Sequence, residues 1–149
     1  MTGPRPAPRA DADEQAWWGF VADRELRLQR CTDCGAWRYP PGPACPDCGA
    51  AQSTWVPLSG RGRVLAWTIF RRTYFPGLPA PYTVISVATD EGPLLVGNLV
   101  PHSDTPPPIG APVQAVFADA RFEDGTGGRI CQWRLAGSDT NPSSEGEQE

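Results

Sequence analysis

Alternating apolar and polar residues predict a chain built mainly from β-strands, preceded by one short helix. The helix is predicted from Asp13, because the acidic start of DEQAWWGFVADREL suits the positive end of a helix dipole and bulky residues gather in its middle. Gly19 weakens this helix by roughly 1 kcal/mol relative to alanine. In the next segment, ELRLQRC, leucines alternate with polar residues, which predicts a strand leading into the first cysteine.

The second half of the chain has the pattern of five strands. A long strand rich in β-branched and aromatic residues is predicted from about Gly62 to Thr73. Segment 81–100 predicts a hairpin joined at 90–92, and segment 111–135 predicts two strands around a Gly/Asp-rich turn. Five such strands suit the small closed barrel of the OB-fold, with an open sandwich as the alternative. Gly62 and Gly97 stand where barrel strands often bulge or bend, which favours closure.

Two cysteine pairs lie between the helix and these strands. Cys31, Cys34, Cys45 and Cys48 form the pattern Cys-x2-Cys-x10-Cys-x2-Cys, and a glycine follows each pair. Two residues between cysteines let a tight turn aim both sulfurs at one point, as tetrahedral zinc requires. Glycine lets the turn adopt a positive φ angle while backbone N–H groups face the thiolates. The spacing therefore predicts a zinc site.

Other uses of the four cysteines fit less well. Disulfides are disfavoured because the chain begins without a secretion signal, and a thioredoxin-like centre uses one Cys-x-x-Cys on a βα unit. Iron is chemically possible in the same thiolate cage. Because four protein ligands fill the coordination sphere, we expect the metal to be structural, replacing a core too small to fold alone.

The predicted fold is therefore mainly β: an N-terminal helix, a rubredoxin-like zinc ribbon and a five-stranded OB-fold barrel. The expected divisions are a disordered arm at 1–12, the helix and leading strand at 13–30, the zinc ribbon at 31–54, the barrel at 55–136 and a disordered acidic tail at 137–149.

Composition and charge narrow the function classes. The 149-residue chain has a formal net charge of -4, so it is a poor general phosphate binder. It has no apolar run near the roughly 20 residues that span a bilayer, and no apolar signal core near its start, which predicts a cytoplasmic protein.

The sequence offers no evident catalytic set. Cys131 stands alone and is predicted to be a small core residue of the last strand. The single histidine, His102, lies in a proline-flanked loop and is predicted to be solvated. No nucleophile is paired with a base, so we expect the chain not to be a complete enzyme by itself.

The order of these parts resembles a known family. AWWGF, LRLQRCTDCG, YPPGPACPDCG and WVPLSGRGRVLAWTIF, followed by a barrel ending after IGAPVQAVF, are similar to the acyl-CoA-associated zinc-ribbon plus OB-fold family, long catalogued as a domain of unknown function. The resemblance covers about residues 13–135. Its most specific motifs are the cysteine pairs with Pro40-Pro41 between them and the segment Ser59-Gly60-Arg61-Gly62.

The resemblance implies a partner role. Members of the family bind thiolase-like proteins of the lipid-transfer type, and in steroid side-chain degradation that partner performs a retro-aldol cleavage of an acyl-CoA. The implied function is a non-catalytic but required subunit of such a carbon–carbon lyase complex. The alternative is a partner of a biosynthetic thiolase or acyltransferase. The resemblance also implies Cys31, Cys34, Cys45 and Cys48 as zinc ligands, and no residue as catalytic.

Two apolar segments are candidate partner-binding surfaces. The helix offers an aromatic anchor, with self-packing as the competing interpretation, and the proline-stiffened loop TYFPGLPAPY offers a second surface, with an ordinary barrel loop as the competitor. The residues concerned are Trp17, Trp18 and Phe20 on the helix, and Tyr74, Phe75 and Leu78 on the loop.

Arginines flanking the first barrel strand suggest two further roles. They suit bidentate contacts to the phosphates of acyl-CoA, at a site of this chain or one shared with the partner. Together with Trp67 and Phe70 they also suggest a single-stranded nucleic-acid binder, but strand alternation places Trp67 and Phe70 on opposite faces, which argues against one platform. The arginines are Arg61, Arg63, Arg71 and Arg72.

Overall fold

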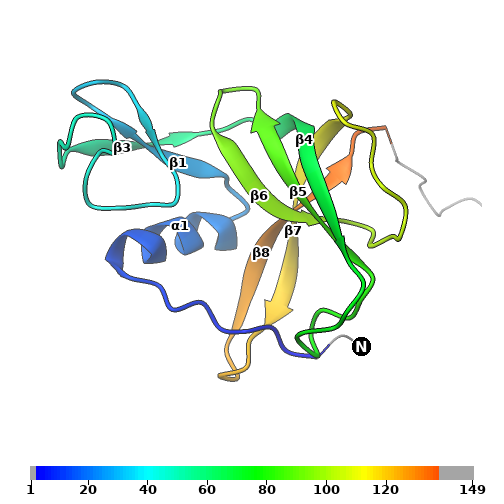
Figure 1. Cartoon of the computed structure of the whole chain (residues 1–149). Helices are drawn as coiled ribbons and strands as arrows, with labels where there is room; N and C mark the ends of the chain where they lie inside the picture. The colour runs from blue at the N-terminus through cyan, green and yellow to red at the C-terminus, as the bar shows by residue number, and fades with distance from the viewer. Residues whose placement is uncertain (1–2, 138–149) are drawn as a thin grey trace, which may run out of the picture.

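A computed structural model describes residues 3–137 as one helix and two β-sheets (Figure 1). The sheets are a three-stranded sheet with the order β2-β1-β3 and a closed barrel with the order β4-β5-β6-β8-β7. The elements are α1 (Ala12–Ala22), β1 (Arg27–Cys31), β2 (Trp37–Arg38), β3 (Ser53–Pro57), β4 (Arg61–Phe70), β5 (Tyr82–Thr89), β6 (Leu94–Leu99), β7 (Pro112–Arg121) and β8 (Gly127–Leu135). The predicted fold class, including closure of the five-stranded barrel, is confirmed.

Helix α1 is fixed at both ends. At its start, the Asp11 side chain accepts a hydrogen bond from the Glu14 amide at 2.9 Å, and the Glu14 carboxylate accepts one from the Asp11 amide, which forms a capping box. At its end, Arg129 of β8 donates to the Ala22 carbonyl, so a cation lies at the negative end of the helix dipole. The helix lies between the ribbon strands and β8 (Figure 1).

The ribbon and the barrel share one hydrophobic core. Leu26 and Leu28, which precede the first cysteine, belong to the same buried cluster as the inward-facing residues of the barrel, and Trp17 of α1 packs against that cluster. The barrel residues of the cluster are Val64, Ile85, Val87, Leu95, Leu99, Val113, Ala115 and Trp133. Burying aliphatic side chains from both parts together stabilises their relative position.

Strand β4 differs from its prediction in two respects. It ends at Phe70, and its irregularity lies between Val64 and Ala66, not at a glycine. Gly62 and Gly97 instead permit close packing: a Cβ at Gly62 would lie 2.6 Å from the Ala88 carbonyl oxygen, and one at Gly97 would lie 3.0 Å from the Trp133 ring.

One edge of β4 is open over most of its length. Residues 61–63 pair with β7 and Val64 bonds to residues 110 and 111. Within residues 3–137, Leu65 is the bulged residue and the segment Ala66–Phe70 pairs only with β5. Leu65–Phe70 contains no charged residue, and Leu65 and Trp67 are exposed.

Residues 3–5 of the N-terminal arm, which is predicted to be disordered over 1–12, lie against the barrel. The Arg5 amide donates to the Arg121 carbonyl at 2.9 Å, and the Glu123 amide donates to the Arg5 carbonyl at 2.9 Å. Gly77 has no side chain, and this lets Pro4 approach the loop after β4. The predicted acidic tail lies outside the described residues except for Gly137. None of the helices in the described part of the chain has the length and apolar character needed to cross a bilayer.

Candidate metal centre and interaction surfaces

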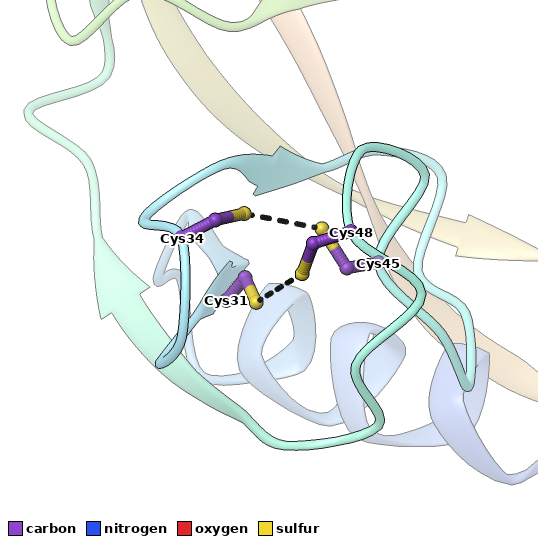
Figure 2. A group of neighbouring side chains, drawn as sticks. All are labelled: Cys31, Cys34, Cys45 and Cys48. Carbon is purple, nitrogen blue, oxygen red and sulfur yellow. Dashed lines mark hydrogen bonds between the residues drawn. The ribbon is translucent and has the colours of Figure 1, made fainter.

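The four predicted cysteine ligands converge on one point (Figure 2). All four sulfurs lie within 4.8 Å of one another, with 3.6 Å between Cys31 and Cys48 and 3.5 Å between Cys34 and Cys45. A tetrahedron of sulfurs around zinc at about 2.3 Å has edges of about 3.8 Å. The four are free cysteines, and their spacing exceeds the roughly 2 Å of a disulfide. The arrangement fits a structural zinc ion with no open coordination position.

Two matching turns hold the cysteines. In each, the first cysteine is buried and the second exposed, and the following glycine, Gly35 or Gly49, has a φ of +76°. The Gly35 amide donates to the Cys31 carbonyl at 3.0 Å, and the Gly49 amide donates to the Cys45 carbonyl at 2.9 Å. The predicted role of glycine after each pair is therefore met, because the αL conformation required here disfavours other residues.

Backbone amides also stabilise the thiolate form of the buried cysteines. The Cys34 amide donates to the Cys31 sulfur and, with the Asp33 amide, lowers the pKa of Cys31 to about 6 against the opposing effect of burial. The Cys48 amide lowers the pKa of Cys45 in the same way. Thiolates are the form that binds a metal ion, so this backbone suits a metal ligand.

Two buried polar residues support the centre and were not predicted from the sequence. Arg38 is 2% exposed, and its guanidinium donates to the carbonyls of Gly42, Ala50, Ala51 and Gln52 at 2.7–3.3 Å. The Gln29 side chain accepts a hydrogen bond from the Gly42 amide at 2.8 Å.

These contacts organise the chain around the second cysteine pair. The only sequence signal for them is their place on strands beside the cysteines, since arginine and glutamine are ordinarily surface residues.

The two residues considered as possible catalysts differ in their surroundings. Cys131 packs against the core, and burial raises its pKa to about 12, so it is a protonated thiol at neutral pH. His102 is exposed and its ring lies 6.3 Å from that of Tyr82. Although the residue is exposed overall, partial desolvation of its ring and the charge of Arg5 lower the pKa of His102, which favours the neutral imidazole.

The aromatic residues of α1 pack within the chain. The rings of Trp17 and Trp18 are 4.9 Å apart, Trp18 meets Phe122 at 6.3 Å, and Phe20 meets Trp55 at 5.2 Å. All three helix residues are half-buried. Self-packing thus accounts for much of their apolar surface, and only the remaining part is available to a partner.

The loop after β4 presents the more exposed aromatic residues. Tyr74 is 60% exposed and Phe75 44% exposed, while Leu78 is half-buried. We call these three residues the loop surface. Its base is a row of rings in which Phe70 stacks on Tyr82 at 4.8 Å and meets Tyr74 edge-on at 6.2 Å.

The four candidate arginines fall into two separate groups. Arg61 pairs with Asp90 at 3.4 Å and Arg63 donates to the Gly110 carbonyl at 3.0 Å, both at the start of β4. Arg71 pairs with Asp104 at 2.8 Å just beyond the other end of the strand. Arg72 lies near the Tyr74 ring, at 5.7 Å. Ten residues of strand span about 30 Å, so the two groups do not form a single phosphate site.

The aromatic residues of β4 do not form the platform that single-stranded nucleic acid would need. Trp67 is exposed, whereas Phe70 is half-buried and stacked on Tyr82, so its ring is not free to stack on a base. A single-strand binder needs a row of exposed rings beside basic residues.

Family comparisons divide the chain as the fold does. Residues 18–53 match the family described as the ChsH2 rubredoxin-like zinc ribbon domain. Residues 55–118 match the ChsH2 C-terminal OB-fold domain.

Curated relatives include subunits of larger enzymes. A probable enoyl-CoA hydratase alpha subunit of Thermomonospora curvata is 37% identical over 116 residues, covering 78% of this chain and 36% of the relative. A 3-oxo-4,17-pregnadiene-20-carboxyl-CoA hydratase alpha subunit of Mycobacterium tuberculosis is 32% identical over 112 residues, covering 75% and 36%. The chain therefore spans about a third of the length of these relatives. A DUF35 domain-containing scaffold protein of Methanocaldococcus jannaschii is 29% identical over 122 residues, covering 76% of this chain and 82% of the relative.

Solved structures match over nearly the whole described fold. A chain of the Ltp2-ChsH2(DUF35) aldolase superposes with a TM-score of 0.77 and 32% identity, covering 87% of this chain and 99% of that chain. A DUF35-family protein of unknown function from Sulfolobus solfataricus superposes with a TM-score of 0.58 at 12% identity, covering 85% and 87%, which shows a common fold.

Proposed function

Because this chain belongs to the ChsH2 (DUF35) family of zinc-ribbon and OB-fold proteins, we propose that it is a non-catalytic accessory subunit of a thiolase-like enzyme acting on acyl-CoA. The partner's proposed reaction is the retro-aldol cleavage of a steroid side chain. The observation that carries the proposal is the similarity to a chain of the Ltp2-ChsH2(DUF35) aldolase, because it extends over 99% of that chain.

The metal centre supports a structural and not a catalytic role. Its four thiolate ligands leave no position for a water molecule or a substrate, so a bound zinc ion would act on folding and not on chemistry. The ion would hold the ribbon against the shared core, which in turn keeps the outer surfaces in a fixed arrangement.

The loop surface is the proposed main contact with the partner. Exposed aromatic residues supply much of the binding energy of protein interfaces when they become buried. Tyr74 and Phe75 are exposed on a loop stiffened by prolines, by the stacked rings beneath and by the N-terminal arm against Gly77. A stiff loop loses little conformational entropy on binding. Trp17, Trp18 and Phe20 are proposed as a second contact through their exposed edges.

Co-expression with a thiolase-like protein of the lipid-transfer type tests the proposal. We expect a stable hetero-oligomer in size-exclusion chromatography with light scattering, and retro-aldol cleavage of a steroid side-chain CoA thioester by the complex but by neither chain alone. Condensation of acyl-CoA in place of cleavage would identify the biosynthetic alternative. A chain that stays monomeric in the presence of the thiolase-like protein would refute the proposal.

Variants of the loop surface test the contact itself. Tyr74→Ala and Phe75→Ala should each raise the Kd of the complex about 30-fold, the effect of losing roughly 2 kcal/mol at a central aromatic contact. Tyr39→Ala is the matched control, because Tyr39 is an aromatic residue of the ribbon that is 39% exposed. If Tyr74→Ala and Phe75→Ala have the same Kd as the Tyr39→Ala control, the loop surface is not the contact with the partner.

The proposed acyl-CoA contacts of the β4 arginines are testable in the same complex. Arginine binds phosphate through bidentate hydrogen bonds, so an Arg→Ala change at a true contact should raise KM for the acyl-CoA and leave assembly intact. Because the two groups lie at opposite ends of β4, only one of them is expected to respond. Arg61 and Arg63 form one group, and Arg71 and Arg72 form the other.

A further inference from the structure

A cavity lies between the N-terminal arm and the β7–β8 hairpin. Its volume is about 390 Å³, within the range of about 300–1,000 Å³ typical of small-molecule sites. The arm contributes Gly3 and Arg5, the segment after β6 contributes Val100 and His102, and the hairpin contributes the remaining residues. The arm crosses the lower end of the hairpin in Figure 1. Three segments distant in sequence therefore form this cavity.

The charges at the cavity are positive and uncompensated. Arg5 is half-buried, and its guanidinium makes one long hydrogen bond, to the Asn98 side chain at 3.4 Å. Within residues 3–137, neither Arg5 nor Arg121 forms an ion pair. The acid at the cavity, Asp119, is already bound to Arg129 at 3.0 Å. A partly desolvated cation such as Arg5 is unfavourable without a counter-ion, and an anion in the cavity would relieve that cost. Arg121 is exposed and offers a second cationic donor to the same anion.

Neutral hydrogen-bonding groups and an apolar floor complete the site. Gln132 is 7% exposed and lines the cavity, so it places a polar residue beside these cations. His102 at the cavity is a further polar group. Val100, Ala118 and Ile130 supply apolar surface beside these groups. The cavity thus combines contacts for an oxyanion with space for an organic body.

We propose that this cavity binds the oxyanion of a small organic molecule, a phosphate ester or a carboxylate, through Arg5 and Arg121, with Gln132 and His102 as polar contacts. The site is distinct from the β4 arginines. Arginine suits such a ligand because its planar fork of N–H donors matches the geometry of both anions. The proposal does not depend on the thiolase-like partner, since every group named belongs to this chain.

The single histidine of the chain provides a direct probe. In the zinc-loaded full chain, NMR titration of the His102 ring is carried out with sodium chloride, with inorganic phosphate and with acetate at equal ionic strength. An anion bound beside the imidazole should raise its pKa by about one unit, because a neighbouring negative charge favours the protonated form. A rise with phosphate alone identifies a phosphate site, and a rise with acetate identifies a carboxylate site. No rise with either anion would overturn the proposal.

Matched arginine variants assign the binding groups. Arg5→Gln and Arg121→Gln should each weaken anion binding at least tenfold, because each removes a charged hydrogen-bond donor. Arg121→Gln acts from the hairpin and leaves the backbone bonds of the arm in place. Arg9→Gln is the control, because Arg9 is an exposed residue of the same arm that lies outside the cavity. Equal affinity in Arg5→Gln, Arg121→Gln and Arg9→Gln would also overturn the proposal.

Discussion

Replacing Arg38 by glutamine should release the second cysteine turn of the ribbon. The Arg38 guanidinium donates to four carbonyls, at 2.7 Å to Ala50, 3.1 Å to Gln52, 3.2 Å to Ala51 and 3.3 Å to Gly42. A hydrogen bond to a charged group contributes about 1.5–3 kcal/mol, but contributions within one network do not add. A glutamine amide has two N–H donors, so at least two of these carbonyls would lose their partner.

The expected loss is about 3–5 kcal/mol, as for removing one member of a buried charged network. That is a large share of the roughly 5–15 kcal/mol that stabilises a typical domain. At about 4 °C per kcal/mol for a chain of this size, the Tm should fall by about 12–20 °C. Zinc should also transfer faster to a coloured chelator, since residues 50–52 directly follow the second cysteine pair.

The control for this prediction is Arg30→Gln on the same β-strand as the first cysteine. Arg30 is exposed, donates to the Gly35 carbonyl at 3.0 Å and lies 5.1 Å from the Trp37 ring. Its loss should cost about 1 kcal/mol or less. The reasoning fails if Arg38→Gln and Arg30→Gln have the same Tm and the same rate of zinc transfer.

Three further changes should have distinct effects. Gly77→Ala should displace the arm, because the added Cβ would overlap the Pro4 carbonyl oxygen. Trypsin should then cleave after Arg9 faster than in the control variant Gly127→Ala, whose added Cβ has no atom within 4 Å. Folding stability, measured by urea unfolding, should decrease as the pH falls below 6.5, the ordinary pKa of histidine. Below that pH the imidazole of the unfolded chain is protonated, whereas the lowered pKa of His102 keeps the folded chain from taking up the proton. His102→Gln should remove this dependence of stability on pH. Cys34→Ser should abolish stoichiometric zinc by elemental analysis, whereas Cys131→Ser should retain it, since only the first lies in the cysteine cluster.

The sequence predicted those features that depend on local spacing. Two residues between cysteines and a glycine after each pair determine the geometry of the turns, so the metal ligands follow from residues only a few positions apart. The strand pattern and the turn at residues 90–92 likewise predicted the β5–β6 hairpin, because period-two alternation reflects one buried and one exposed face.

Features that depend on contacts distant in sequence were not predicted. A proline-rich arm has few residues to bury, and nothing in its own composition indicates that Arg5 pairs beside Phe122 or that Gly77 receives Pro4. The role of Arg38 was missed for the same reason, since its four carbonyl partners become neighbours only after the ribbon folds. A bulge or bend is expected at Gly62 and Gly97 because glycine often marks one, whereas these glycines allow close approaches to β5 and to Trp133, and the bulge lies between Val64 and Ala66.

The open edge of β4 has a consequence for how this protein is produced. An uncharged, apolar strand edge with unpaired backbone groups is a template for pairing with another chain, and Leu65–Phe70 carries no proline or lysine that would prevent this. At high concentration the isolated chain should therefore self-associate through this edge, with losses in solubility that grow with its expression level. Thr68 is exposed on this edge, so Thr68→Lys should reduce that association without disturbing the barrel core.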